Sequence, residues 1–107
     1  MQNVLVTGGA GFIGSHLVER LLAEGGRAVH VVDDFNDFYD PSVKRRNVEP
    51  HLGREGFRLH EADIRDRAAL ANIFREARFD CVVHLAARAG VRPSLERVIR
   101  QIGRAHV

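Results

Sequence analysis

The fold of this chain is decided by residues 7–14, which read TGGAGFIG. A short apolar run, residues 4–6, comes directly before them, and apolar residues at helical spacing come directly after. An apolar, β-branched run without alternation is typical of a strand buried on both faces of a parallel sheet. Residues 7–14 therefore predict a sharp turn from a buried strand into a helix.

The glycines of this turn, Gly8, Gly11 and Gly14, indicate a dinucleotide site. Glycine lets the chain turn sharply, lets the backbone approach a pyrophosphate, and lets helix and strand pack closely. The helix amino terminus adds N–H groups and a partial positive charge that attract phosphates. The alternative is a tight strand-to-helix turn without a ligand.

The helix after the turn is expected to pack on the sheet through an apolar face. The residues that recur at helical spacing are Phe12, Ile13, Leu17, Leu21 and Leu22. Gly25 and Gly26 are expected to end this helix.

Strands and helices are expected to alternate along the rest of the chain. The expected strands are residues 28–32, 57–62 and 81–85. Between the first two we expect a loop and one short helix that starts at Asp40, and Asp66 is expected to cap another helix. This order predicts an α/β, Rossmann-type three-layer fold with an incomplete parallel sheet of four strands in the order 3-2-1-4.

Asp33 ends the second expected strand, about 20 residues after the last glycine, where a carboxylate meets the ribose hydroxyls of NAD. A carboxylate here, with Asp34 beside it, would repel the extra phosphate of NADP. Arg45 and Arg46 are too far along the chain to be obvious partners of that phosphate, so the sequence favours NAD. The alternative is an ordinary helix-capping acid.

Four segments together resemble the extended short-chain dehydrogenase/reductase family of NAD-dependent epimerases and dehydratases, and most closely its UDP-glucuronate 4-epimerase branch. They are residues 7–14, 32–41, 61–66 and 83–94. The resemblance runs from about residue 4 to residue 96. Arg88 departs from the family, in which a neutral amide is usual at this place.

The resemblance implies roles for individual residues. The implied NAD contacts are Gly8, Gly11, Phe12, Ile13, Gly14, Asp33, Asn36, Asp63, Ile64, Leu85, Ala86 and Ala87. In this assignment Asp63 and Ile64 flank the adenine. Arg92 and Ser94 would border the sugar-nucleotide substrate, although a solvated arginine and a helix cap are an equal alternative for these two.

The family's catalytic pair is a tyrosine followed four residues later by a lysine. The only tyrosine here is Tyr39, with Val43 four residues beyond it, so we expect no catalytic residue in this chain and no activity of the chain alone. The resemblance implies a parent enzyme that epimerises a UDP-sugar with NAD and forms a homodimer. The alternatives are a sugar-nucleotide dehydratase or decarboxylase of the same family, or a non-enzymatic dinucleotide-binding module.

The composition argues against other classes of function. The net charge is only +2, and Lys44 is the sole lysine among arginines interspersed with acids, so no nucleic-acid-binding stripe is expected. Cys81 stands alone, which predicts neither a disulfide nor a metal cluster. No targeting signal or run of membrane-spanning length is visible, so no membrane partner and a cytoplasmic location are expected.

The chain divides into two expected parts. Residues 1–101 form the truncated NAD-binding Rossmann half-domain. Residues 102–107 read IGRAHV, which is the translation of a common sequencing-adapter string. We therefore expect a non-native tail here, and the alternative is a genuine basic tail.

Overall fold

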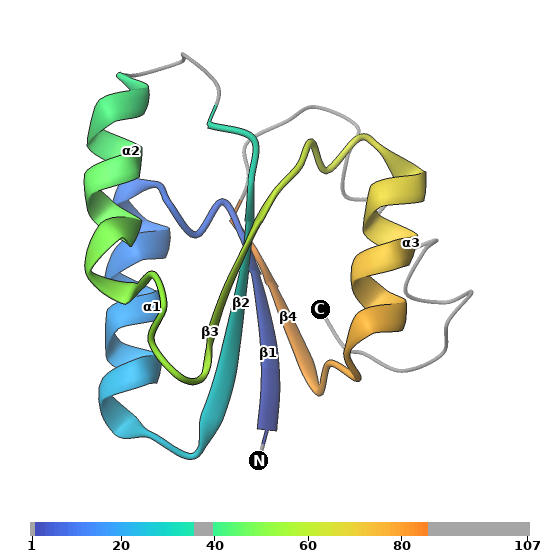
Figure 1. Cartoon of the computed structure of the whole chain (residues 1–107), viewed down its shortest axis with the longest axis horizontal. Coiled ribbons are helices and arrows are strands. Elements are labelled where there is room, and N and C mark those ends of the chain that lie inside the picture. The colour runs from blue at the N-terminus through green and yellow to red at the C-terminus, as the bar shows by residue number, and fades with distance from the viewer. Residues whose placement is uncertain (1, 36–39, 86–107) are drawn as a thin grey trace.

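A parallel sheet forms the centre of the molecule (Figure 1). The computed structural model describes residues 2–35 and 40–85. In this part the strands are β1 (Gln2–Thr7), β2 (Arg27–Asp33), β3 (Phe57–Glu61) and β4 (Cys81–His84), in the spatial order β3-β2-β1-β4. All three pairings are parallel, which confirms the predicted strand order.

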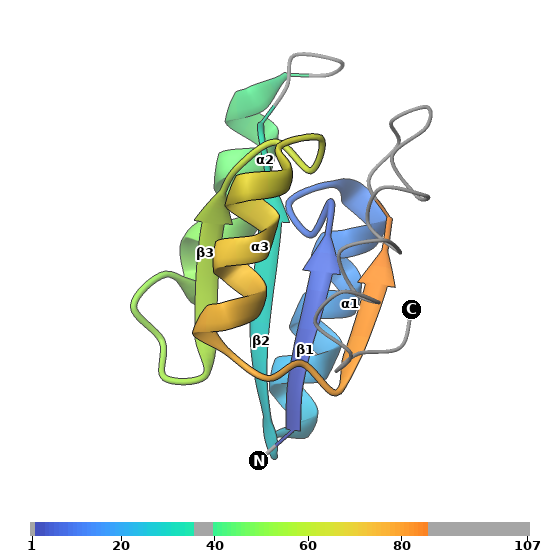
Figure 2. The ribbon, with the colours of Figure 1, turned by 90° about the vertical axis from the view of Figure 1, so that its right-hand side faces the viewer.

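Helices cover both faces of the sheet, as the two ribbon views show (Figures 1 and 2). The helices α1 (Phe12–Glu24) and α2 (Pro41–Val48) lie on one face, and α3 (Arg67–Glu76) lies on the other. A 3₁₀ turn at Glu49–His51 follows α2. The predicted three-layer arrangement is therefore confirmed.

The helix boundaries follow the capping residues that the sequence indicates. The Asp40 carboxylate accepts the Ser42 N–H at 3.0 Å, and the Asp66 carboxylate accepts the Ala69 N–H at 3.1 Å. Gly25 ends α1 with a φ of 73°, a left-handed conformation that glycine adopts without steric cost. These local signals are strong because helix ends leave backbone groups that need partners.

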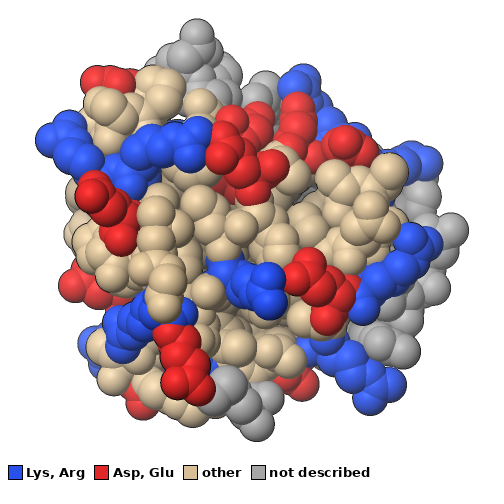
Figure 3. All heavy atoms as spheres, in the orientation of Figure 1, with Lys and Arg blue, Asp and Glu red and all other residues tan. Residues whose placement is uncertain are grey.

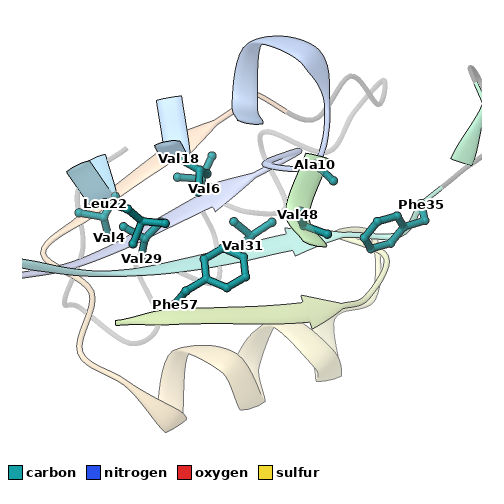
Figure 4. Close-up of a cluster of buried hydrophobic side chains, with 10 residues drawn as sticks. All are labelled: Val4, Val6, Ala10, Val18, Leu22, Val29, Val31, Phe35, Val48 and Phe57. Carbon is teal, nitrogen blue, oxygen red and sulfur yellow. The ribbon is translucent and has the colours of Figure 1, made fainter. Parts of the chain in front are cut away.

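The core lies in two apolar clusters, one on each face of the sheet, because successive strand side chains point to opposite faces. In β1, Val4 and Val6 face α1, whereas Leu5 faces α3. The cluster on the α1 face is drawn in Figure 4 and comprises Val4, Val6, Ala10, Val18, Leu22, Val29, Val31, Phe35, Val48 and Phe57. The opposite cluster comprises Leu5, Val32, Ile64, Leu70, Ile73, Phe74, Phe79 and Val82.

The expected apolar face of α1 is wrong in its first turn. Phe12 and Ile13 are 71% and 70% exposed, and the buried positions of this helix are instead Gly14, Ser15, Val18 and Leu22. The reason is steric, because the close approach of the helix to the glycine turn leaves room only for small side chains.

Charged side chains of opposite sign lie next to one another on the face shown in Figure 3. Arg58 pairs with Glu76 at 3.3 Å, and Arg20 pairs with Glu24 at 3.4 Å. Among the described residues, no helix is long and apolar enough to cross a membrane. The same residues contain no group of three or more His, Cys, Asp or Glu side chains that could hold a metal ion.

Candidate functional site

The glycine turn connects β1 to α1 with very little space. Gly8 has a φ of 72°, and its N–H donates to the Val32 carbonyl at 2.8 Å. A Cβ on Gly14 would lie 2.2 Å from the Gly8 carbonyl oxygen, and a Cβ on Gly9 would lie 2.7 Å from methyl carbons of Val31. The turn therefore requires glycine for its backbone conformation at Gly8 and for packing at Gly9 and Gly14.

The amino terminus of α1 opens at this turn. Gly11 is the N-cap residue, with an extended backbone and no side chain to cap the helix, and its carbonyl accepts the Ser15 N–H at 2.8 Å. No acidic residue lies in the first turn. A helix start of this kind presents N–H groups and a partial positive charge, which suits a phosphate group.

Asp33 lies beside the glycine turn at the carboxyl end of β2. Its side chain is only 3% exposed. One carboxylate oxygen accepts the Ala10 N–H at 3.2 Å, and the other accepts the Phe35 N–H at 2.9 Å. The expectation that Asp33 and the glycine turn share one end of the sheet is therefore confirmed.

Helix α2 supplies a cation to this carboxylate. The Lys44 ammonium lies 3.3 Å from Asp33 Oδ1, and the Lys44 side chain is only 8% exposed. Lys44 reaches Asp33 from 11 positions further along the chain, because α2 packs beside the glycine turn. One turn later, the Asn47 amide donates to the Ala10 carbonyl at 2.9 Å.

A second charged group lies just outside Asp33. The Arg45 guanidinium forms a two-point ion pair with the Glu61 carboxylate and lies 3.9 Å above the Phe35 ring centroid. Its hydrogen bond to Glu61, assisted by the charges of Glu61 and Asp33, raises the pKa of Arg45. The same hydrogen bond lowers the pKa of Glu61. Phe35 has a φ of 52°, a strained conformation for a residue with a side chain.

The two predicted adenine contacts lie in different surroundings. The Asp63 carboxylate accepts the Arg65 N–H at 2.9 Å and also contacts the Arg65 guanidinium, with the shortest distance 2.5 Å. The hydrogen bond between the Arg65 guanidinium and the Asp63 carboxylate raises the pKa of Arg65. Ile64 is buried in the apolar cluster under α3, so only its backbone can contribute to a ligand site.

The carboxyl end of β4 joins the site through Thr7. Thr7 Oγ1 lies 2.6 Å from His84 Nδ1, and the Leu85 N–H donates to the Thr7 carbonyl at 3.0 Å. Leu85 is 38% exposed. The glycine turn, Asp33 and Leu85 therefore all lie at the carboxyl ends of their strands, where ligands bind in open parallel sheets.

Comparisons with known proteins identify the family. The family model for GDP-mannose 4,6 dehydratase matches residues 5–103. The chain belongs to this family. The match confirms the resemblance drawn from the four sequence segments, at the level of nucleotide-sugar epimerases and dehydratases.

Individual members of this family are close to the chain in sequence. It is 48% identical over 94 residues to UDP-glucuronate 4-epimerase 3 of Arabidopsis thaliana, a match that covers 88% of the chain and 21% of that protein. It is 47% identical over 98 residues to UDP-glucose 4-epimerase 2 of the same plant, which covers 90% of the chain and 27% of that protein. The chain thus spans about a quarter of the length of these relatives.

A solved structure of a family member has the same fold. The crystal structure of UDP-glucuronic acid 4-epimerase from Bacillus cereus, in complex with NAD, superposes with a TM-score of 0.82 at 29% identity. The match covers 94% of this chain and 37% of that one. The Rossmann-type fold predicted from the sequence is therefore shared with this family member.

Some of the predicted site residues lie outside the described part of the chain. These are Asn36, Ala86, Ala87, Arg92 and Ser94, and residues 102–107 lie outside it as well. Among the described residues, sequence reasoning missed Lys44 and Asn47. One signal was visible, because Lys44 is the only lysine in a chain whose other basic residues are all arginine.

Proposed function

We propose that this chain is the NAD-binding amino-terminal portion of a sugar-nucleotide 4-epimerase that acts on a UDP-uronic acid. The observation that carries the proposal is the buried Asp33 carboxylate, which hydrogen bonds to the glycine turn at the end of β2. A dinucleotide needs this combination, because its pyrophosphate and its ribose lie next to each other. The NAD in the related Bacillus cereus structure supports the same cofactor here.

The residues present fit this cofactor. The backbone N–H groups of residues 12–14 would bind the pyrophosphate, and the absence of a side chain at Gly14 gives the close backbone packing that this requires. Asp33 would accept the ribose hydroxyls, and Asp63 with the Ile64 backbone would border the adenine. Bound NAD would supply hydride-transfer chemistry, and the residues of this chain would bind and orient it.

We assign no catalytic residue to this chain. The tyrosine and lysine that transfer the proton in this family have no counterpart at Tyr39, because Val43 occupies the fourth place after it. Substrate contacts from Arg92 and Ser94, a homodimeric parent and a cytoplasmic location stay predictions.

A second candidate is a sugar-nucleotide dehydratase. The description of the matching family model, GDP-mannose 4,6 dehydratase, favours it specifically. Both reactions use the same cofactor-binding half, and the fold alone does not decide between activities.

Binding of NAD to the chain tests the cofactor assignment. Replacing Asp33 with Asn should weaken NAD binding by about 1–3 kcal/mol, because the ribose hydroxyls lose a charged acceptor. The control is Glu24→Gln, which removes the same charge at the far end of α1. NMR titration of the glycine-turn amides measures both affinities. Equal NAD affinity in wild type and Asp33→Asn would remove Asp33 from the site.

Product analysis separates the two reactions. The uninterrupted gene that carries this sequence should be expressed and incubated with UDP-glucuronate and with GDP-mannose. A 4-epimer of UDP-glucuronate, with no 4-keto-6-deoxy sugar from GDP-mannose, is the expected result. Formation of the keto sugar alone would support the dehydratase instead.

A further inference from the structure

A pair of histidines joins β2 to β3, which is the outer strand of the described sheet beside α3 (Figure 2). His30 Nδ1 of β2 lies 3.0 Å from His60 Nε2 of β3. The ring planes are inclined by only 8°, so the two nitrogens face each other edge to edge. His30 is buried and His60 is partly buried. The pair therefore adds a side-chain contact to the backbone bonds that hold β3 on β2.

The pair can accept one further proton but not two. One ring must offer a lone pair where the other offers an N–H, so the contact survives when a single ring is a cation. When both rings are cations, two N–H groups and two like charges face each other across 3.0 Å. Burial lowers the pKa of both rings, and the charge of His60 lowers the pKa of His30 further. The second proton therefore breaks the contact, whereas the first does not.

The charged groups around the pair determine which ring takes the first proton. Glu76, the last residue of α3, lies 4.0 Å from His60 Nδ1, so a cationic His60 gains a counter-ion. Arg58 of β3 lies 3.3 Å from the same carboxylate and opposes this gain. The adjoining loop contributes one charge of each sign at residues 54–55. Because Glu76 faces His60 directly, His60 is protonated first and His30 second.

A hollow beside the pair gives water a way in. It has a volume of about 420 Å³ and lies where β2, β3 and the end of α3 meet. Its lining includes His30, Ala28, Phe57, Arg58 and Glu76. Rings that separate at this place can therefore be hydrated without opening the apolar cluster on the α1 face.

Ring contacts connect the pair to α3 as well. The Phe79 ring lies 4.9 Å from the His30 ring and 5.3 Å from the Phe74 ring, measured between centroids. Phe74 is one of the buried residues by which α3 packs on the sheet. A displacement of His30 would therefore loosen the packing at the end of α3, next to Glu76.

We propose that the His30–His60 pair is an acid-sensitive switch that controls local opening of β3 and the end of α3. With at most one extra proton the pair stays in contact and β3 stays on β2. With two, the rings separate, water enters through the hollow, and β3 detaches while β1 and β4 remain folded. The switch does not depend on the proposed cofactor site, which lies on the opposite face of β2.

Amide hydrogen exchange in the full chain tests the switch. The Val29 N–H donates to the Gly56 carbonyl at 2.7 Å, and the Ala62 N–H donates to the Asp33 carbonyl at 3.1 Å, at the two ends of the β2–β3 pairing. Their protection factors should fall more than tenfold per pH unit between about pH 6 and pH 5, because opening takes up more than one proton. The β1 amides should stay at least about tenfold better protected, because only complete unfolding exposes them.

Variants count the protons. His60→Gln keeps a side chain that can hydrogen bond to His30 but cannot be protonated, so the loss of protection should be no more than about tenfold per pH unit. His30→Gln should give the same lower slope, and it serves if His60→Gln does not fold. His16→Gln is the matched control, since it alters an exposed histidine of α1 and should keep the wild-type slope.

Each outcome decides for or against the switch. A wild-type slope of tenfold per pH unit or less would show that opening does not require the second proton, and the proposal would be wrong. One common protection factor for Val29, Ala62 and the β1 amides would show that acid unfolds the whole chain instead. Wild-type slopes in both His60→Gln and His30→Gln would assign the proton uptake to groups outside the pair.

Discussion

One buried and one partly buried polar pair lie on opposite faces of the same sheet, and they are built differently. On the α2 face, Asp33 pairs with Lys44, a contact between opposite charges. On the α3 face, His30 Nδ1 lies 3.0 Å from His60 Nε2, a contact between two groups that can both become cations. The first pair borders the glycine turn, whereas the second lies beside the apolar cluster under α3.

The geometry of the histidine pair requires at least one neutral ring. The ring planes are inclined by only 8° and the ring centroids are 5.3 Å apart. Nitrogens at 3.0 Å can then face each other only along the line between the centroids, so the rings lie edge to edge around one shared proton. Burial, reinforced by the His60 charge, lowers the pKa of His30 to about 4. Burial also lowers the pKa of His60.

The charged groups around the histidine pair do not reverse this effect. Glu76 lies 4.0 Å from His60 Nδ1 and acts to raise the pKa of both rings, but Arg58 pairs with Glu76 and acts in the opposite sense. The Phe79 ring packs nearly perpendicular to the His30 ring, with the ring centroids 4.9 Å apart. Burial on the α3 face therefore favours neutral histidines, whereas the charged Asp33–Lys44 pair lies at the proposed ligand site.

The largest expected effect comes from breaking the charged pair on one side only. Lys44→Met should lower the free energy of unfolding by about 3–5 kcal/mol, because it leaves a buried carboxylate without its cation. The double variant Asp33→Asn, Lys44→Met should recover most of this loss, because neither charge remains. Urea denaturation of the three chains measures the difference. A double variant as unstable as Lys44→Met would show that the loss does not come from an unpaired buried carboxylate.

A substitution at Gly14 tests how strongly the face with the Asp33–Lys44 pair depends on the close backbone packing of the glycine turn. Gly14→Ala should cost about 3 kcal/mol, because the new Cβ would meet the Gly8 carbonyl at 2.2 Å and neither backbone can easily move. Gly53→Ala is the control, since its φ is 76° but no atom lies within 4 Å of its Cβ position. It should cost only about 1 kcal/mol of backbone strain. Equal losses in thermal unfolding would contradict the packing argument.

Acid should lower the free energy of unfolding through the His30–His60 pair. The pKa of His30 is about 4 in the folded chain against 6.5 as its ordinary value, so the unfolded chain takes up the proton first. The free energy of unfolding that the neutral His30 contributes is therefore complete above pH 6.5 and is lost as the pH falls toward 4. The full pKa shift of His30 corresponds to about 3 kcal/mol of unfolding free energy. Partial access of water to the ring reduces this contribution to about 2 kcal/mol.

Variants isolate this contribution from the titration of carboxylates. The loss of stability between about pH 7 and pH 4 should be smaller in His30→Gln than in wild type. His16→Gln, which alters an exposed histidine of α1, should keep the wild-type slope. A His30→Gln chain with the full wild-type pH dependence would rule out the pair as its source.

The smallest expected effect concerns the exposed charges. Arg45→Met removes the ion pair with Glu61, in which both side chains are about half exposed. Water and salt screen such a pair, so the midpoint of thermal unfolding should hardly change. A drop as large as that of Lys44→Met would show that burial does not separate the two kinds of charge.

Local sequence signals predicted much of the fold. Asp40, Asp66 and Gly25 marked helix ends because capping depends on residues next to each other in the chain. Asp33 was placed by its spacing of about 20 residues from the last glycine of the turn and by its position at the end of the second expected strand. The face of α1 was misjudged at Phe12 and Ile13, because periodicity does not show where close backbone packing excludes large side chains.

The sequence by itself determined the order of strands and helices, the glycine turn and the acid that faces it. These features follow from turn chemistry, helix capping and the alternation of elements, all of which act over short distances along the chain. Only the tertiary structure decided that Lys44 meets Asp33 and that His30 meets His60. Those contacts depend on how α2 docks and on the register of β2 with β3, which pairs Val32 with His60. Docking and register arise from packing between segments far apart in sequence, so no local pattern encodes them.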